Sequence, residues 1–124
     1  MIQPELTEKI LHFVAIERMS QDAKWGEQNH DPRFWMSVLG EEFGESCRAA
    51  NHLMWGDFDS AVNRFHYALE LLQTAAVAVA AVEALTRLLS DADLGVFYDS
   101  LDDWEVAARR RWQEFITPQK VEAE

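Results

Sequence analysis

Thr74-Ala75-Ala76-Val77-Ala78-Val79-Ala80-Ala81-Val82 is the stretch that decides the fold, because it is small and apolar on nearly every side. It lies in a segment without glycine or proline between Gly56 and Gly95. This pattern predicts a long helix that ends near Leu89 and is buried on several sides. Asp57 and Asp59 are its candidate N-caps.

A helix of about thirty residues is roughly 45 Å long, which exceeds the width of a small domain. Its apolar second half therefore offers more surface than one subunit of this size can cover. We expect an oligomer in which Val77, Ala80 and Ala81 lie near a subunit contact.

The rest of the chain also favours helices, because no segment alternates regularly between apolar and polar residues. The predicted elements are a helix from Pro4 to Ala23, a loop at 24–30, a helix from the Asp31-Pro32 start signal to Met54 closed by Gly56, an acidic loop from residue 91, and a helix from Leu101 to Phe115 with Ser100 as N-cap. The expected fold class is all-α, a four-helix-bundle-like single domain over residues 1–124 with one long central helix. Its core covers about 4–90, residues 91–116 add the loop and last helix, and 117–124 form a tail.

Composition limits the classes of partner. The 124 residues hold 22 acidic residues against 11 Lys and Arg, a net charge of −11. Such a surface disfavours nucleic-acid polymers and anionic membranes. The single cysteine, Cys47, excludes an internal disulfide and indicates a cytoplasmic protein. Met1 to Lys9 lacks the apolar run of a signal peptide, and the apolar stretch Leu71 to Leu85 is too short to span a bilayer.

The predicted second helix contains an unusual acidic motif, Gly40-Glu41-Glu42-Phe43-Gly44-Glu45. On a helix its three glutamates crowd one side, where like charges repel. Each glycine costs about 1 kcal/mol relative to alanine inside a helix. Close approach of a neighbouring helix, or room for a ligand, would explain the two glycines.

A polar stripe runs down the long helix through Asn63, His66, Glu70 and Gln73, which are spaced by three and four residues. If this stripe faces Glu42 and Glu45, several carboxylates and one amide meet inside a bundle. Such a cluster is costly unless a cation or protons neutralise it. Oxygen ligands without cysteine or paired histidine favour Mg²⁺ or Mn²⁺. The alternative is a solvated acidic face beside a satisfied polar stripe.

Glu42-Phe43-Gly44-Glu45, followed by Glu70-Leu71-Leu72-Gln73, resembles the ExxE…ExxD signature of the all-α nucleoside triphosphate pyrophosphohydrolases, the MazG-like superfamily. Trp25, the His30-Asp31-Pro32-Arg33 helix start and Trp55 resemble the flanks of that signature in dCTP pyrophosphatases. The resemblance covers roughly residues 10 to 90.

The resemblance implies a Mg²⁺-dependent hydrolase that works as a homodimer or homotetramer and cleaves a nucleoside triphosphate to a monophosphate and pyrophosphate. Glu42, Glu45 and Glu70 would hold the metal, with Glu41 as a further ligand or base. The sequence departs from the signature at Gln73, which stands where the relatives have Asp. Gln73 would supply an oxygen to the metal but no charge.

Six further residues are candidates for the substrate side of such a site. Trp25 could stack on a base or cover the end of the bundle, and Lys24 and Arg33 flank the same loop and could meet phosphates. His30 could bind a phosphate or base edge, or support the Asp31 cap. Trp55 matches a substrate-side Trp of the family and could equally be packing. His66, one turn before Glu70, could support that ligand or be a satisfied core histidine.

Two other functions compete with hydrolysis. A non-enzymatic acidic helical protein, either a partner-binding module or a DNA mimic, would use the charge of −11 against a basic protein and would need no metal. Glu27-Gln28-Asn29-His30 matches the E-x-x-H motif of di-iron bundles. That motif occurs once and falls in a predicted loop, so it is the weakest of the three hypotheses.

Overall fold

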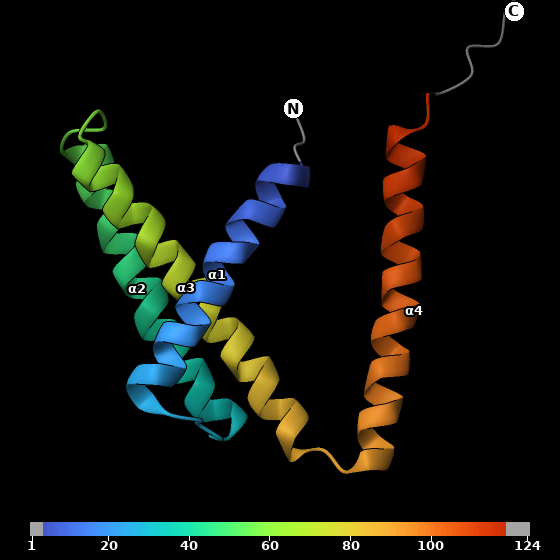
Figure 1. The fold of residues 1–124 in the computed structure, drawn as a ribbon. Helices are drawn as coiled ribbons and strands as arrows, with labels where there is room; N and C mark the ends of the chain where they lie inside the picture. The colour runs from blue at the N-terminus through green and yellow to red at the C-terminus, as the bar shows by residue number, and fades with distance from the viewer. Residues whose placement is uncertain (1–3, 119–124) are drawn as a thin grey trace, which may run out of the picture. The chain divides into compact units, whose positions relative to one another are not determined.

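The computed structural model describes residues 4–118, and this range is all-helical without a strand (Figure 1). The helices are α1 (Pro4–Trp25), α2 (Pro32–Trp55), α3 (Ala61–Leu88) and α4 (Asp91–Ile116). The all-α prediction is confirmed. The chain divides into two compact units, the first ending at Leu88 and the second beginning at Leu89. Each unit is described by itself.

Local signals in the sequence set the ends of α2. The side chain of Asp31 accepts hydrogen bonds from the backbone N–H groups of Arg33 and Phe34 at 2.8 and 3.1 Å. Pro32 follows as the first helical residue, where its missing N–H costs nothing. At the other end, the N–H of Gly56 donates to the carbonyl of His52. The predicted start and end of this helix are confirmed to within one residue.

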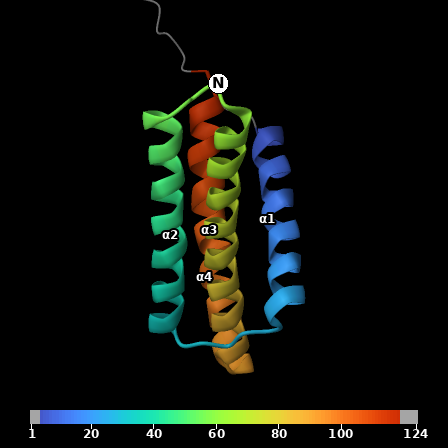
Figure 2. The same cartoon turned by 90° about the vertical axis from the view of Figure 1, so that its left-hand side faces the viewer.

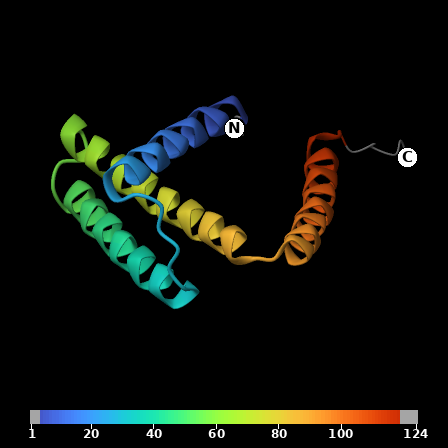
Figure 3. The ribbon, with the colours of Figure 1, turned by 60° about the horizontal axis from the view of Figure 1, so that its bottom comes forward.

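In the first unit, α1 and α2 both pack on α3, which lies between them (Figures 2 and 3). Small side chains on α3 permit this close approach, since the distance between helix axes depends on the residues at the contact. Val77, Ala80 and Ala84 pack with Trp35 of α2 in a buried cluster. The small apolar stretch that predicted a central helix therefore forms the core of this unit.

Two arginines tie segments far apart in sequence to α3. Arg18 of α1 donates from Nε to Glu83 Oε1 at 2.7 Å, and its guanidinium also meets Asp22 at 2.8 Å. Arg87 pairs with Glu27 at 2.6 Å and donates to the amide oxygen of Asn29 at 2.7 Å. The first contact fixes α1 against α3, and the second fixes the α1–α2 loop.

The burial of α3 differs from the prediction in one respect. Val77 and Ala80 are 6% and 4% exposed and pack in the core of their own unit, so these two side chains are not open to a subunit contact, whereas Ala81 is only partly buried. The expected subunit contact near these residues stays a prediction. The large apolar residues that remain open on the described helix are Val79, Val82, Leu85 and Leu88 in its second half and Val62, Phe65 and Leu71 in its first half. An outward face of α3 is therefore available, but it is not the face of Val77 and Ala80.

Among the described residues, α3 also has the length and apolar composition of a membrane-crossing helix, with a mean hydropathy of 1.6 over its best 18 residues. The whole helix has 28 residues and is thus longer than the apolar stretch counted from the sequence. A single such helix is weak evidence for a span, because the core helix of a soluble protein meets the same criterion.

The second unit consists of α4, and its start corrects the prediction. Residues 91–100 were expected as an acidic loop with Ser100 as N-cap, but the helix begins at Asp91. Ser90 is the N-cap, and its hydroxyl accepts a hydrogen bond from the N–H of Asp93 at 3.2 Å. Gly95 does not break the helix, since glycine only weakens a helix interior. Of the predicted tail, residues 119–124 lie outside the described range.

The N-cap of α3 is also different from the prediction. The helix begins at Ala61, and the hydroxyl of Ser60 accepts from the N–H of Asn63 at 3.3 Å. Asp57 and Asp59 lie in the preceding turn, where Asp57 accepts from the N–H of Asp59 and Asp59 pairs with Arg64. The loop between α2 and α3 is thus held by its own polar side chains.

Candidate metal centre

Three glutamates from two helices converge between α2 and α3. Glu42 and Glu45 lie one turn apart on α2, and Glu70 lies on α3. One carboxylate oxygen of each residue lies within 4.8 Å of the others. All three side chains are partly buried. The predicted convergence of the acidic motif with the polar stripe of the long helix is therefore present in the fold.

A hydrogen bond between two hydroxyls sets the register of these two helices. Ser46 Oγ and Thr74 Oγ1 lie 2.9 Å apart across the α2–α3 contact. The hydroxyl that accepts this bond can donate its own hydrogen to a carbonyl of its own helix, Ser46 to that of Glu42 or Thr74 to that of Glu70. The residues that carry these carbonyls are the same two glutamates that meet in the cluster. The polar contact thus holds α2 and α3 at the level where the carboxylates meet.

The cluster is electrostatically strained in the absence of a cation. Burial raises the pKa of Glu42 above its ordinary value of 4.5, and the charges of Glu45, Glu70, Glu17 and Glu41 raise it further. The Oε2 atoms of Glu42 and Glu70 are both inaccessible to solvent and have no hydrogen-bond partner among the described residues. Buried carboxylate oxygens usually have partners, so this pair of oxygens is suited to a cation or a proton.

A polar cavity of about 370 Å³ opens beside the cluster, between α1 and the α2–α3 pair. Its lining consists of Glu17, Ser20, Gln21, Lys24, Trp25, Glu42 and Gln73. This volume lies in the range typical of small-molecule sites. Lys24 provides a positive charge near the acids, with its ammonium 4.9 Å from the ring centroid of Trp25.

A second, smaller cavity of about 120 Å³ adjoins the first and shares Gln21, Trp25 and Glu42 with it. Arg18, Arg87 and Trp35 also line it. Within the described residues the buried indole Nε1 of Trp35 has no hydrogen-bond partner. Glu42 of the acidic cluster therefore borders two neighbouring spaces, of which the smaller is also lined by two arginines.

The structure brings four of the predicted site residues outside the glutamate triad to the cluster or its cavity. Gln73, Lys24 and Trp25 line the polar cavity. His66 reaches the cluster from its own helix, with Nε2 3.3 Å from Oε1 of Glu70. This contact fits the predicted supporting role of His66 for a ligand.

The remaining predicted residues lie elsewhere. His30 packs on Phe34 and Trp35, with ring centroids 4.0 and 5.4 Å apart. The side chain of Arg33 is 95% exposed and reaches only Asp31, at 3.8 Å. These two side chains line neither of the two cavities, so the geometry gives no support to their predicted contacts with substrate.

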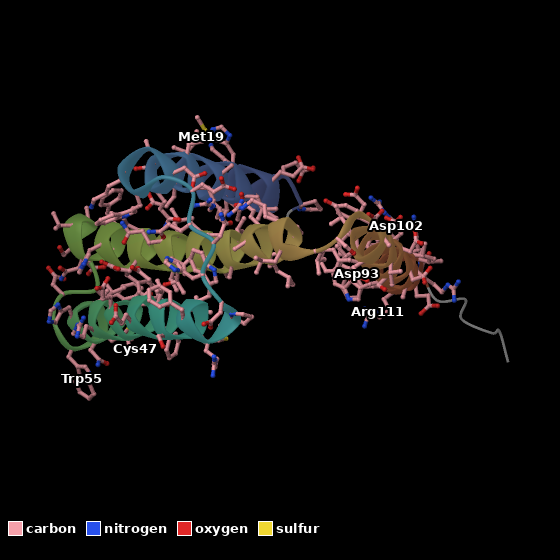
Figure 4. The ribbon with its side chains drawn as sticks, turned by 90° about the horizontal axis from the view of Figure 1, so that it is seen from below. Met19, Cys47, Trp55, Asp93, Asp102 and Arg111 are labelled. Atoms are coloured by element: carbon pink, nitrogen blue, oxygen red, sulfur yellow. The ribbon has the colours of Figure 1, made fainter. Side chains whose placement is uncertain are left out.

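Trp55 and Glu41 are also outside the cluster. Trp55 is 88% exposed at the end of α2 and points away from the helices (Figure 4). Glu41 is exposed and is not part of the converging triad, although its charge acts on Glu42. Cys47 is exposed on the outer side of α2 (Figure 4).

Two residues of the site were not predicted. Glu17 stands alone on the apolar stripe of α1, and this isolated carboxylate was the available signal. It faces the polar cavity because α1 crosses α3 at this level. Trp35 follows the start signal of α2 by three residues and gave no signal of its own, because an aromatic residue at that position is ordinary core.

The glycines of the acidic motif do not serve a close helix contact. A Cβ added at Gly40 or Gly44 would meet nothing within 4 Å. The open space at both positions counts against a close helix contact within this subunit, and room for a ligand stays a prediction.

Comparison with known proteins adds no constraint on this arrangement. The chain matches no family model, no curated protein and no solved structure. The geometry of the cluster and its two cavities is therefore what indicates a function.

Proposed function

We propose that the protein is a Mg²⁺-dependent nucleoside triphosphate pyrophosphohydrolase of the MazG-like type, acting in the cytoplasm as a homodimer or homotetramer. The observation that supports this proposal best is the convergence of Glu42, Glu45 and Glu70 within 4.8 Å. Acidic clusters are common on protein surfaces without an ion, but here two carboxylate oxygens are buried without a partner. A buried anion of this kind is destabilising unless it is compensated.

The donor set fits magnesium or manganese. The oxygens of Glu42, Glu45 and Glu70 would hold the ion, with the amide oxygen of Gln73 as a neutral fourth donor from the same cavity. Hard divalent cations prefer such oxygen ligands, and Mg²⁺ often completes its shell with water and substrate phosphates. When bound, the ion would neutralise charge, orient the phosphates and lower the pKa of the attacking water.

The residues around the cavity supply the remaining functions. Lys24 lines the polar cavity and is placed to contact a phosphate oxygen, and Trp25 offers a ring face to a base. Trp25 also lines the smaller cavity, which is the adjoining space for the nucleoside end of the substrate. In the reaction, water attacks the α-phosphorus and the bond to the bridging oxygen of pyrophosphate breaks. Glu17, on the α1 side of the cavity, can take the proton of that water.

Hydrolysis can be tested directly with a panel of nucleoside triphosphates in the presence of Mg²⁺ or Mn²⁺. The expected result is release of pyrophosphate and a nucleoside monophosphate from at least one substrate, with loss of the activity in EDTA. Release of orthophosphate instead would place the attack at the γ-phosphorus and would contradict the proposed reaction.

The net charge of −11 supports one alternative, an acidic module that binds a basic protein. Such a module needs no divalent cation. If calorimetry detects neither Mg²⁺ nor Mn²⁺ binding and no triphosphate in the panel is cleaved, the acidic interaction module becomes the better explanation.

A further inference from the structure

The helix α4 forms the second unit by itself and presents an apolar stripe along its length. Residues spaced by three and four positions share one face of a helix. On this helix they are Leu94, Phe97, Leu101, Trp104, Ala108 and Phe115. The spacing follows the a and d positions of a heptad repeat, with Arg111 at the remaining position of the seam.

A single helix cannot bury its own stripe, so the unit needs a partner for its stability. A helix in a protein owes most of its stability to the packing of its amphipathic face and less to its intrinsic propensity. This one also contains Gly95, which lowers its propensity further. The seam holds Phe97, Leu101 and Trp104, large apolar side chains whose burial against a second helix is favourable. The stripe therefore has a strong tendency to associate.

Charge on α4 is strongly divided between its two halves. Residues 91–105 hold six acidic residues and no Lys or Arg. Residues 106–116 hold three arginines, Arg109, Arg110 and Arg111, and one acid, Glu114. Figure 4 labels Asp93 and Asp102 from the acidic half and Arg111 from the basic half. Two copies of this helix in a parallel pair would place like charges side by side along their whole length, whereas an antiparallel pair places the arginines 109–111 of each copy near the first acids, Asp91 and Asp93, of the other, with the acids 99–105 of both copies at the centre.

We propose that α4 pairs with α4 of a second copy of this chain as an antiparallel two-helix coil. The seam fits this arrangement when Leu101 lies opposite Trp104 of the second copy. Phe97 then lies opposite Ala108, so that a large side chain meets a small one, as dense packing requires. In the same register Arg111 falls beside Asp93 of the second copy. The pairing does not depend on the proposed hydrolase activity.

The first test compares two substitutions that add the same charge to different faces of α4. Trp104→Glu places a carboxylate in the seam, and Val106→Glu places it on the opposite face. Light scattering at micromolar concentration should show an oligomer of the 14.3 kDa chain. Trp104→Glu should halve the mass of that particle, and Val106→Glu should leave it unchanged. A monomeric wild type, or an oligomer that withstands Trp104→Glu, overturns the proposal, because the stripe would then pack within its own chain or remain open.

The second test measures direction with spin labels on the full chain in a Cys47→Ser background. Single cysteines replace Val96, Asp103 or Gln113, which lie away from the seam. At 1.5 Å per residue, an antiparallel pair separates the two labels along the axis by about 20 Å at position 96, about 2 Å at 103 and about 30 Å at 113. Distances that are shortest at position 103 and lengthen toward both ends support the antiparallel pair. Equal distances at all three positions indicate a parallel pair and overturn it.

Discussion

Ser46 and Thr74 join α2 to α3 by a hydroxyl–hydroxyl hydrogen bond of 2.9 Å at the level where the carboxylates meet. Ser46 is 4% exposed and is a buried polar residue of the core. One hydroxyl donates to the other, and the accepting hydroxyl can donate to the carbonyl of Glu42 or of Glu70 on its own helix, which forms one polar chain. A sliding of α2 along α3 would break this chain and separate the glutamates.

The first prediction concerns this hydrogen bond. Ser46→Ala should lower the free energy of unfolding by about 1 kcal/mol, the usual value of a buried hydrogen bond. In a domain of this size that change corresponds to a fall in Tm of several degrees, about 4–8 °C. Ser37→Ala is the matched control on the same helix, because the Ser37 hydroxyl is exposed and bonds only the carbonyl of Arg33. Equal effects of the two substitutions in thermal melts would show that Thr74 is not a partner of Ser46.

The second prediction concerns pH. Because burial and neighbouring acids raise the pKa of Glu42, the folded state binds the proton more tightly than the unfolded state. The stability that this provides is fully present below the ordinary value of 4.5 and is lost as pH rises through the raised pKa. The urea midpoint of the protein in EDTA should therefore decrease as pH rises from 4.5 through the raised pKa. Glu42→Gln should make this decrease of the midpoint with pH less steep. Adding Mg²⁺ above the raised pKa should restore stability to the wild type. Identical slopes for both proteins would contradict the assignment.

The third prediction tests the ligand set. Glu42→Gln, Glu45→Gln and Glu70→Gln should each lower the rate of pyrophosphate release by at least about 100-fold, the upper end of the effect of losing a partner at a metal site. Glu8→Gln on the exposed face of α1 is the control and should keep full activity. If Glu70→Gln hydrolyses as fast as the wild type, the convergence of α2 with α3 has no catalytic role.

The extent to which sequence predicts this fold is clearest at helix ends. The start of α2 was predicted because its signals are local. Asp31 and Pro32 are adjacent, and the side chain of Asp31 bonds backbone N–H groups only two and three residues further on. The start of α4 was missed because the acidic run that begins at Asp91 was interpreted as a loop. The Ser90 cap and Asp93, three residues later, form the local pattern that marks a helix start. Both signals are local, and the error came from giving the run of acids too much weight.

The candidate site also has a part that local sequence predicts and a part that only tertiary contacts determine. The pair Glu42 and Glu45 could be predicted because helical spacing alone places them together. Their meeting with Glu70 required the register of α2 on α3, which the resemblance suggested and no local pattern determines. Trp35 became part of the site through its packing on α3 from α2, and Glu17 through the angle at which α1 crosses α3. The contacts that set this angle, such as Arg18 with Glu83, join residues that are 65 positions apart.

The fourth prediction concerns the glycines of α2. Gly40→Ala should raise the free energy of unfolding by up to about 1 kcal/mol, because alanine favours the helix and the new Cβ meets nothing within 4 Å. Gly56→Ala provides the contrast, since its Cβ would lie 2.5 Å from the carbonyl oxygen of His52. The urea midpoint of unfolding should therefore rise for Gly40→Ala and fall for Gly56→Ala. A destabilised Gly40→Ala would show that another molecule approaches this face of α2.

The fifth prediction concerns Gln73, which lines the polar cavity with Glu42. At this position a carboxylate would add a charge to the metal site, whereas the amide adds only a neutral oxygen. Two unit charges 4 Å apart interact by roughly 4 kcal/mol at an effective dielectric near 20, and a divalent ion doubles this. Desolvation and repulsion from the three glutamates offset most of that gain, so we expect a net effect of about 1.4 kcal/mol, or tenfold in affinity.

Gln73→Asp should accordingly tighten Mg²⁺ binding in the substrate-free protein about tenfold, and Gln73→Leu should weaken it, because an oxygen donor is lost. Metal titration by calorimetry on the wild type and the two variants measures this directly. Thermal melts should show whether each variant is folded before it is titrated. Equal affinities in all three proteins would place Gln73 outside the metal shell. The polar stripe of α3 would then reach the ion through Glu70 alone, and the cavity wall at Gln73 would face the substrate.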